Sequence, residues 1–279
     1  MDIRSLLIGN NFRYNKALGQ NFITDTNLLD AIAEDANITS EDTVVEIGTG
    51  AGTLTRSLAK RAKRVITFEV DRNLEPILKT TLSTFDNIKV CFEDVLKMTD
   101  EEFLDIVDGE FMVVANLPYY ITTPLIMRFF ESDLPVKSLT LMMQKEVANR
   151  MIAKAGTSDY GAITAVIDLQ SNVTIARNIS REMFYPVPKV DSALVHIEID
   201  KNKHKIEDLN FVKKVIKSAF MWRRKTFVNN MNSSFSLPKE EGVKMLEEMG
   251  FVSTIRGEKF NTTEFIELAS KIKVYKDNH

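Results

Sequence analysis

The chain has little of several features that would point to other classes of protein. Its 279 residues include one cysteine, Cys91, and three histidines, which are His196, His204 and His279. A single cysteine excludes internal disulfides and a thiolate metal cluster and suits a reducing cytosol, and the histidines lack the spacing of metal ligands. We therefore expect a cytoplasmic protein without a metal site, in which Cys91 is a small buried residue on a strand.

Long apolar runs are also missing. No stretch approaches the ~20 apolar residues that cross a bilayer, and the N-terminal Met-Asp-Ile-Arg-Ser-Leu-Leu lacks the charged-then-apolar pattern of a secretory signal. The hydrophobic content of 44% and the charged content of 27% are ordinary for a globular protein. We expect no membrane contact, and either one large domain or a medium domain followed by a small one.

Negative charge is in slight excess, but it is unevenly distributed. The formal net charge is −3, yet residues 201–279 carry 16 Lys/Arg against 10 Asp/Glu, whereas residues 1–200 carry 20 against 29. Between Leu209 and Lys239 there are seven basic residues and no acidic one. Because phosphate binding depends on the local field, this basic segment is a candidate for contact with nucleic acid, with a solvated helix face as the alternative.

Short apolar segments alternate with amphipathic ones over residues 1–200. The expected strands are Thr43–Ile47, Arg64–Glu69, Ile88–Phe92, Phe111–Ala115 and Ser138–Met143, and the helices between them are Leu54–Ala62, Asn73–Thr81 and Thr123–Glu131. This alternation predicts an α/β fold with a doubly wound, Rossmann-like sheet. Further strand-like segments at Ala162–Gln170, Val173–Ala176 and Ala193–Ile199 predict a hairpin at one sheet edge.

A polar tract at Lys201–Asp208 has the composition of a linker. Beyond it, apolar residues recur at helical spacing in Phe211–Phe220, Lys239–Met249 and Thr263–Ile272. We therefore expect a catalytic domain over residues 1–203 and a small helical domain over residues 204–279.

The tetrapeptide Asn116-Leu117-Pro118-Tyr119 follows the strand expected at residues 111–115. The side-chain oxygen of Asn116 and the carbonyl of Leu117 can each accept a hydrogen from a planar exocyclic amine. Pro118 fixes the turn and has no N–H to compete, and Tyr119 offers a ring on which a base can stack. Asn-Xaa-Pro is also a common turn signal, so the tetrapeptide alone does not decide between a turn and a site.

A glycine-rich loop with Gly48, Gly50 and Gly52 follows the first expected strand. Its spacing differs from the G-x-G-x-x-G of dinucleotide sites, which favours a ligand without a pyrophosphate, such as S-adenosylmethionine. Glu69, 21 residues after Gly48, ends the next strand and can bind both hydroxyls of a ribose. Glu93-Asp94 follows the third strand, and a carboxylate there could accept a hydrogen bond from an adenine amine. Each acid alone could be a turn residue or a helix cap, but together they predict a nucleoside-type cofactor.

Asn116 ends the fourth strand on the same rim, which predicts methyl transfer to a base nitrogen. The N6 lone pair of adenine is delocalised, so two acceptors that pull the amine towards tetrahedral geometry would direct the lone pair at the methyl donor without a strong base. Phe184, on a proline-stiffened loop, could form a second wall for a flipped base opposite Tyr119. A hydrophobic plug under the loop is the alternative for Phe184.

Several motifs resemble those of the ribosomal RNA adenine N6-dimethyltransferases. They are Lys16–Phe22, Glu46–Gly52, Asn116–Tyr119, Met143–Glu146, Phe184–Ser192 and Trp222–Thr226 followed by Asn229-Asn230. The overall pattern looks most like the bacterial small-subunit type. This resemblance implies a class I methyltransferase sheet and dimethylation of two adjacent adenosines in a hairpin near the 3′ end of 16S rRNA, late in 30S assembly.

The resemblance also implies roles for individual residues. Ile23 would contact the methyl donor through its backbone, although the family often has leucine there, and Asn116 would meet both donor and target amine. The full donor-binding set is Asn21, Ile23, Gly48, Gly50, Glu69, Asp94 and Asn116.

In the C-terminal domain the resemblance makes Arg223, Arg224 and Lys225 the candidates for gripping rRNA in the 30S subunit or its late precursor. Trp222 stands where other members often have a smaller or polar residue, and we expect it to pack in the core. Nothing in the sequence suggests a large apolar interface, so we expect a monomer.

Three alternatives remain at this point. A resistance-type relative that dimethylates an adenosine of 23S rRNA shares the catalytic motifs, and only similarity at residues 223–225 favours the small-subunit type. A DNA adenine methyltransferase uses a related turn, but no DNA contacts are identifiable. A non-catalytic assembly or transcription factor on the same fold is disfavoured by the intact Asn116, Glu69 and glycine loop.

Overall fold

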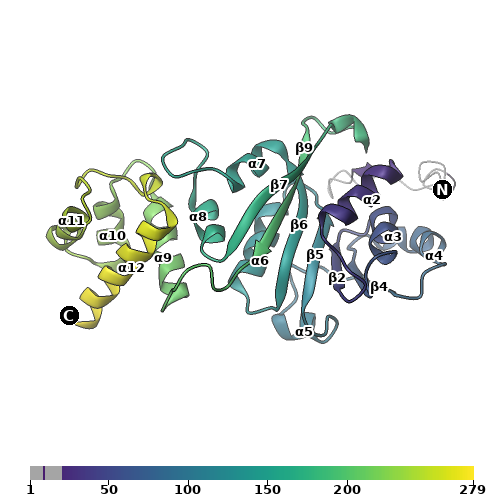
Figure 1. Ribbon diagram of the computed structural model, residues 1–279, viewed down its shortest axis with the longest axis horizontal. Coiled ribbons are helices and arrows are strands. Elements are labelled where there is room, and N and C mark those ends of the chain that lie inside the picture. Colours follow the sequence, from purple (N-terminus) through teal and green to yellow (C-terminus); the bar gives the residue numbers. More distant parts are fainter. Residues whose placement is uncertain (1–8, 10–20) are drawn as a thin grey trace. The chain divides into compact units, whose positions relative to one another are not determined.

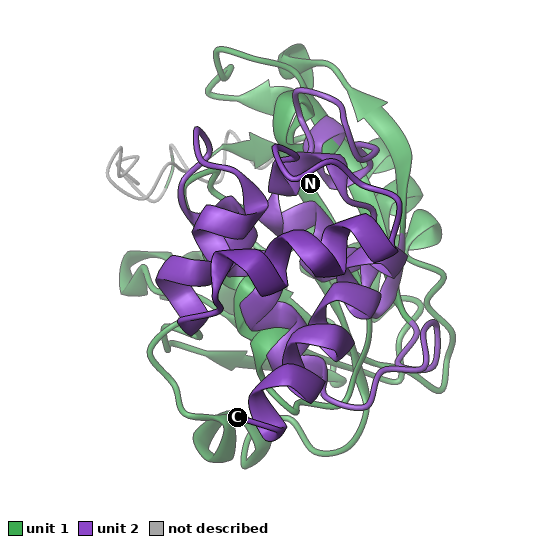
Figure 2. Cartoon of the chain, turned by 90° about the vertical axis from the view of Figure 1, so that its left-hand side faces the viewer, with its two compact units in different colours: residues 1–148, 173–199 green, residues 149–172, 200–279 purple. Residues whose placement is uncertain are grey.

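The computed structural model describes residue 9 and residues 21–279, which fold into two compact units (Figure 2). The first unit is built from the chain up to residue 148 together with residues 173–199, and the second from residues 149–172 and 200–279. The chain therefore passes between the units three times. The segment 149–172, which the sequence pattern does not set apart, lies with the C-terminal helices.

The first unit is organised around a seven-stranded sheet in the order β4-β3-β2-β5-β6-β9-β7 (Figure 1). The strands are β2 (Thr43–Ile47), β3 (Arg64–Phe68), β4 (Ile88–Cys91), β5 (Phe111–Asn116), β6 (Val136–Gln144), β7 (Ser171–Ile179) and β9 (Ser192–Ile199). The pairs β2–β3, β2–β5, β3–β4 and β5–β6 are parallel, whereas β9 is antiparallel to β6. The expected α/β class, with β9 and β7 together at one edge, is confirmed.

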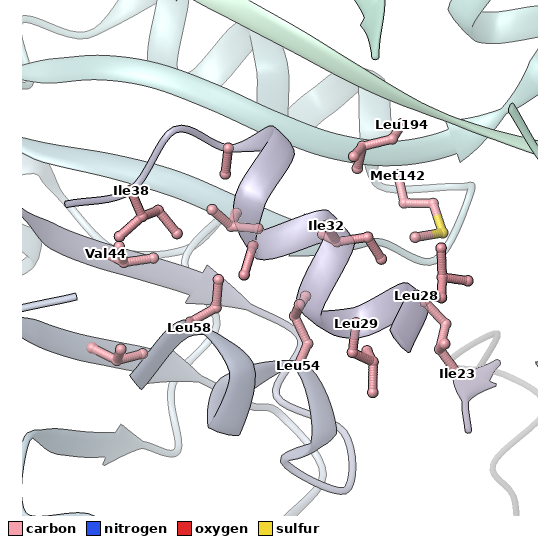
Figure 3. Packing of buried hydrophobic residues seen from close by; sticks show 14 of the residues in the cluster. Ile23, Leu28, Leu29, Ile32, Ile38, Val44, Leu54, Leu58, Met142 and Leu194 are labelled. Carbon is pink, nitrogen blue, oxygen red and sulfur yellow. The ribbon is translucent and has the colours of Figure 1, made fainter. Parts of the chain in front are cut away.

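One face of this sheet is covered by α2 (Thr26–Asp35) and α3 (Thr53–Ala59). Figure 3 shows Ile32 of α2 and Leu54 and Leu58 of α3 among the apolar side chains that gather between these helices and the strands. The strands contribute alternate residues to this face, such as Val44 of β2, because successive side chains of a strand point to opposite sides.

The opposite face carries a cluster of aromatic rings. Phe68 of β3 stacks on Phe103 of α5 (Asp100–Leu104) at 5.6 Å between centroids, and Phe103 also packs against Phe111 of β5. Phe129 of α6 (Thr122–Glu131) meets both Phe103 and Phe111 edge-on. Because both faces are covered, the central strands are mainly apolar on both sides, as parallel strands usually are.

The remaining helices of this part of the chain are α4 (Glu75–Thr81), which follows the 3₁₀ turn η2 (Arg72–Leu74), and α7 (Lys145–Met151). Cys91 is buried at the end of β4, as expected. No helix among the described residues is both long enough and apolar enough to cross a membrane.

The second unit is helical. It contains α8 (Ala162–Asp168), α9 (Leu209–Met221), α10 (Phe227–Phe235), α11 (Lys239–Glu248), the 3₁₀ turn η4 (Gly257–Lys259) and α12 (Thr262–Asp277). The strand expected at residues 162–170 is wrong, since this segment is α8. Its middle residues, 164–167, are all buried, so the sequence shows no amphipathic period that would separate a short buried helix from a buried strand.

The helices of the second unit meet around phenylalanines. Phe260 contacts Phe227 and Phe265 edge-on, at 5.0 and 5.6 Å between centroids, and all three rings are fully buried. Polar contacts add to this core, because Asp168 at the end of α8 accepts hydrogen bonds from Lys203 (2.6 Å) and from the hydroxyl of Thr262. These contacts connect the segment 149–172 to the C-terminal helices.

Candidate active site

A cavity of about 370 Å³ lies at the carboxyl ends of the parallel strands, where the strand order reverses between β2 and β5. Such a reversal point is where open α/β sheets bind ligands, and the volume is typical of pockets for small molecules. The predicted site residues of the first unit all line this cavity. They are Asn21, Ile23, Gly48, Gly50, Glu69, Asp94, Asn116, Leu117, Pro118, Tyr119 and Phe184.

The glycine loop after β2 is held against the end of β3. The N–H groups of Gly48 and Thr49 both donate to the carbonyl of Phe68, at 2.9 and 3.3 Å. Gly50 has φ = +57°, and a Cβ placed there would come within 3.1 Å of the ring of Phe22. The loop therefore needs glycine at this position for both its backbone conformation and its close packing.

Glu69 is buried at the edge of the cavity and is held by the backbone. Its Oε1 accepts the N–H groups of Val70 and Asp71, both at 2.9 Å, and its Oε2 accepts the N–H of Gly50 at 2.8 Å. Burial raises the pKa of Glu69, although these three N–H groups favour its charged form. Oε2 takes one hydrogen bond, so it keeps acceptor capacity for a hydroxyl group of a ligand.

Asp94 lies at the same rim in a more open setting. Its Oδ1 accepts the N–H of Leu96 at 3.1 Å, and its Oδ2 is 3.2 Å from the ammonium of Lys97. The Lys97 side chain is 83% exposed, so this ion pair is weak and does not block the carboxylate.

The side-chain amide of Asn116 has a defined orientation at the end of β5. Its Nδ2 donates to the carbonyl of Asn21 at 3.0 Å. Only the NH₂ end can donate to a carbonyl, so this bond identifies Oδ1 as the amide's remaining acceptor. The carbonyl of Leu117 also takes no hydrogen bond from the described backbone. The turn therefore offers two acceptors to the cavity.

Two aromatic residues approach the cavity from different elements. The hydroxyl of Tyr119 lies 3.0 Å from Oγ of Ser192 at the start of β9. Phe184 belongs to β8 (Phe184–Tyr185), which pairs antiparallel with β1 (Phe22–Ile23). Phe184 is 3% exposed and belongs to the apolar cluster between α2, α3 and the sheet, so it both lines the cavity and forms part of the core.

Glu46, treated in the sequence only as the first residue of the glycine motif, has an unusual environment. It is fully buried on β2, and its Oε2 accepts the hydroxyls of Thr55 (2.5 Å) and Thr67 (2.9 Å). Its Oε1 has no hydrogen-bond partner in the described structure, and the residue lines the cavity. Burial raises the pKa of Glu46 to about 8. An acidic residue inside an otherwise apolar strand, two positions before the first glycine, was the available signal for this group.

Tyr120 was also missed. It follows the tetrapeptide, is 60% exposed and lines the cavity. The two consecutive tyrosines in the sequence were the signal that an aromatic side chain also lies at the outer edge of the site.

The basic candidates lie in the second unit. Arg223, Arg224 and Lys225 are exposed in the turn between α9 and α10. The expectation that Trp222 packs in the core is wrong, because this residue is 39% exposed. It ends α9 with an extended backbone, which turns the chain away from the helix axis.

Two further predictions concern the first family motif and a metal site. Residues 16–20 of the first family motif lie outside the described residues. Over residues 21–279 there is no cluster of three or more His, Cys, Asp or Glu side chains arranged to hold a metal ion.

Comparison with known proteins identifies the family. Residues 11–267 match the family model described as ribosomal RNA adenine dimethylase. The chain belongs to this family. It is 42% identical over 265 residues to ribosomal RNA small subunit methyltransferase A of Clostridioides difficile (strain 630), covering 94% of this chain and 92% of that protein. A protein of the same name from Geobacillus thermodenitrificans (strain NG80-2) is 40% identical, with 96% and 94% covered.

Solved structures agree with this assignment. A dimethyladenosine transferase from Plasmodium falciparum has a TM-score of 0.76 and 26% identity, covering 92% of this chain and 98% of that one. The 23S rRNA methyltransferase ErmE has a TM-score of 0.70 at 24% identity, with 90% and 99% covered, and this likeness shows the shared fold. As a ribosomal RNA adenine dimethylase, the protein is an enzyme that uses S-adenosylmethionine to methylate ribosomal RNA.

Proposed function

We propose that this dimethylase modifies two adjacent adenosines in the 3′-terminal hairpin of 16S rRNA, within the 30S subunit or its late precursor. The proposal is supported by relatives with 40–42% identity over most of the chain that carry the name small subunit methyltransferase. Similarity to the 23S enzyme ErmE is 24% and extends to the fold. We further propose that the protein acts as a cytoplasmic monomer and needs no metal.

The observation that carries the proposal is that the residues we assign to the methyl donor and those we assign to the target amine line one cavity. S-adenosylmethionine, when bound, supplies an electrophilic methyl group. We assign its ribose to Glu69, whose carboxylate is already fixed by three backbone N–H groups, and its adenine to Asp94. Gly48 and Gly50 would give the backbone close approach to the donor, with Asn21 and the backbone of Ile23 beside them.

The target amine is assigned to the turn after β5. Oδ1 of Asn116 and the carbonyl of Leu117 would each accept one hydrogen of the adenine N6 amine, which draws the nitrogen towards tetrahedral geometry and localises its lone pair. Pro118 keeps the turn rigid, and Tyr119 and Phe184 would hold the flipped base. Positioned acceptors of this kind act by orientation and electrostatics, so no general base is required before methyl transfer.

The test of this mechanism is Asn116→Ala, with methylation of undermethylated 30S particles measured using labelled methyl donor. Loss of a positioned polar group of this kind lowers rates by about 10²–10³-fold, and RNA binding should be largely kept. Asn232→Ala is the matched control, because that amide also donates to a backbone carbonyl (Leu237, 2.8 Å) but lies in the helical unit. Full activity of Asn116→Ala would refute the mechanism.

The substrate is tested by primer extension on 16S and 23S rRNA after reaction with the protein, because dimethylated adenines block reverse transcription. Two adjacent stops near the 3′ end of 16S rRNA are expected. A stop on 23S rRNA instead would establish the resistance-type activity, and no stop on either RNA would contradict the proposal.

A further inference from the structure

The turn between α9 and α10 exposes an aromatic ring among cations. We call residues 221–225 the Trp222 turn. Met221 is 57% exposed and Trp222 39% exposed, and the next three residues, Arg223, Arg224 and Lys225, are all exposed. Tryptophan is on average well buried, and tryptophan and arginine side chains that lie together on a surface are typical of binding sites.

The geometry of the turn fixes one cation against the indole. The N–H of Lys225 donates to the carbonyl of Trp222 at 2.9 Å, which closes the turn. The ammonium of Lys225 then lies 4.5 Å from the centroid of the Trp222 ring, a cation–π contact. Within the described structure, Arg223, Arg224 and Lys225 form no ion pair with a carboxylate, so their charge is not neutralised by the protein.

The two ends of the Trp222 turn are held firmly. On the α9 side, the buried amide of Asn230 donates to the carbonyl of Ala219 at 2.8 Å. A Cβ placed on Gly257 would lie 2.6 Å from the same carbonyl, so η4 packs directly on the last turn of α9. On the α10 side, Phe227 is 1% exposed and its N–H donates to the carbonyl of Ile255 at 2.8 Å. The exposed ring therefore projects from a fixed frame.

A purely structural role explains only part of this arrangement. One cation near the carbonyls that end α9 would complement the helix dipole, and Lys225 can provide it. The dipole does not account for two further arginines without carboxylate partners, nor for an indole left open to solvent. Stacking of unpaired bases on aromatic rings beside basic side chains is the usual way in which proteins bind single-stranded RNA.

We propose that Trp222 is a stacking platform for an unpaired base of the substrate RNA, with Arg223, Arg224 and Lys225 contacting the phosphates on either side. This inference rests on the proposed function, because it takes ribosomal RNA as the ligand. It adds a base-contacting residue to a turn for which family resemblance implies only cationic contacts.

Trp222 provides its own probe, since it is the single tryptophan of the chain. Its fluorescence should be recorded while the full-length protein is titrated with a single-stranded oligouridylate, and in parallel with a fully paired RNA hairpin of the same charge. Stacking quenches indole emission, so the single strand should quench and the hairpin should quench much less. Equal quenching by both RNAs, or none by either, would overturn the proposal.

Substitutions of Trp222 distinguish base stacking on an aromatic ring from simple apolar contact. Base stacking on one aromatic contributes about 1–3 kcal/mol, so Trp222→Ala should weaken oligouridylate binding at least about 5-fold, and Trp222→Phe should restore most of the loss. Restoration by Trp222→Leu to the same extent would mean that an apolar contact suffices, and would refute stacking. The result does not depend on stability, because the aromatic and aliphatic variants are compared with each other.

The charge control uses a second lysine that lies over an aromatic ring. Lys276 is 5.4 Å from the centroid of Phe235, an arrangement similar to that of Lys225 and Trp222. For the single-stranded oligouridylate, Lys225→Ala should reduce the magnitude of the slope of log K against log salt by about 0.7, whereas Lys276→Ala should not change it. An equal change in both variants would refute a specific role for the Trp222 turn.

Methylation of 30S particles by the wild-type protein is measured alongside. Normal methylation with unchanged oligouridylate binding by Trp222→Ala would refute the stacking proposal alone. Absence of methylation with intact quenching would refute the proposed function alone.

Discussion

Replacing Glu46 by glutamine should change how the stability of the first unit depends on pH. In the folded protein Oε2 of Glu46 accepts two threonine hydroxyls, and Oε1 has no partner in the described structure. A proton on this carboxyl therefore sits on Oε1. Glutamine has the same shape as the protonated acid, with its oxygen able to accept both hydroxyls, so the substitution removes the titration while keeping the packing.

The direction and size of this change in stability follow from the pKa of Glu46 in the folded and the unfolded states. Burial raises the pKa of Glu46 from its ordinary 4.5 to about 8, so between these pH values the folded state keeps a proton that the unfolded state has released. The free energy of unfolding consequently falls as pH rises. The contribution of protonated Glu46 to the free energy of unfolding is fully present below pH 4.5 and is lost by about pH 8. At roughly 1.4 kcal/mol per pKa unit, this contribution amounts to about 5 kcal/mol.

The assay is urea unfolding of the wild type and Glu46→Gln followed by far-UV circular dichroism, with separate transitions fitted for the two units because such a chain need not unfold in one step. From about pH 5.5 to about pH 7.5 the wild type should lose about 2–3 kcal/mol relative to the variant. Glu75→Gln is the control, because Glu75 is at the surface beside Lys79 and its pKa is lowered. A Glu46→Gln difference that is constant over this range would refute the reasoning.

Two glycine substitutions test close packing. Gly50→Ala should weaken S-adenosylmethionine binding at least about 10-fold by calorimetry, because φ is +57° and the new Cβ meets a phenylalanine ring at 3.1 Å. Gly109→Ala has similar strain (φ +75°) but open space, so it should leave binding unchanged. Gly257→Ala should destabilise the helical unit by roughly 1–3 kcal/mol, since its Cβ would lie 2.6 Å from an α9 carbonyl. Gly161→Ala, where the new Cβ would meet open space, should destabilise the helical unit less. Equal losses of stability in Gly257→Ala and Gly161→Ala would refute the packing argument.

The sheet and the row of residues at its strand ends were predictable because their signals are local. A buried strand is a short apolar run, a glycine loop is visible in the chain, and the carboxyl ends of parallel strands meet at one edge of the sheet. Gly48, Glu69, Asp94 and Asn116 could therefore be placed together from the sequence, and the structure brings them to one cavity. Their individual roles stay predictions.

The features that escaped prediction depend on contacts between distant segments. The assignment of α8 failed because its four middle residues are all buried, and the helices that contact it, α9 and α12, follow much later in the chain. The pKa of Glu46 is raised by burial in the surrounding core, even though the hydroxyls of Thr55 and Thr67 act to lower it, and its position in the sequence reveals none of these contacts. Trp222 was expected in the core because of its type, and the backbone at the end of α9 turned it outward.

The threefold passage of the chain between its two units limits how the protein can be divided. The helical unit takes α8 from the middle of the sequence and the other helices from the end. A protein shortened at residue 199 would keep α8 but lose the α9 surface that covers it, and would expose apolar side chains at residues 165–167. The isolated C-terminal piece would lack the same contact. The helical unit can therefore complete its core only after α9 has been synthesised, although α8 leaves the ribosome much earlier.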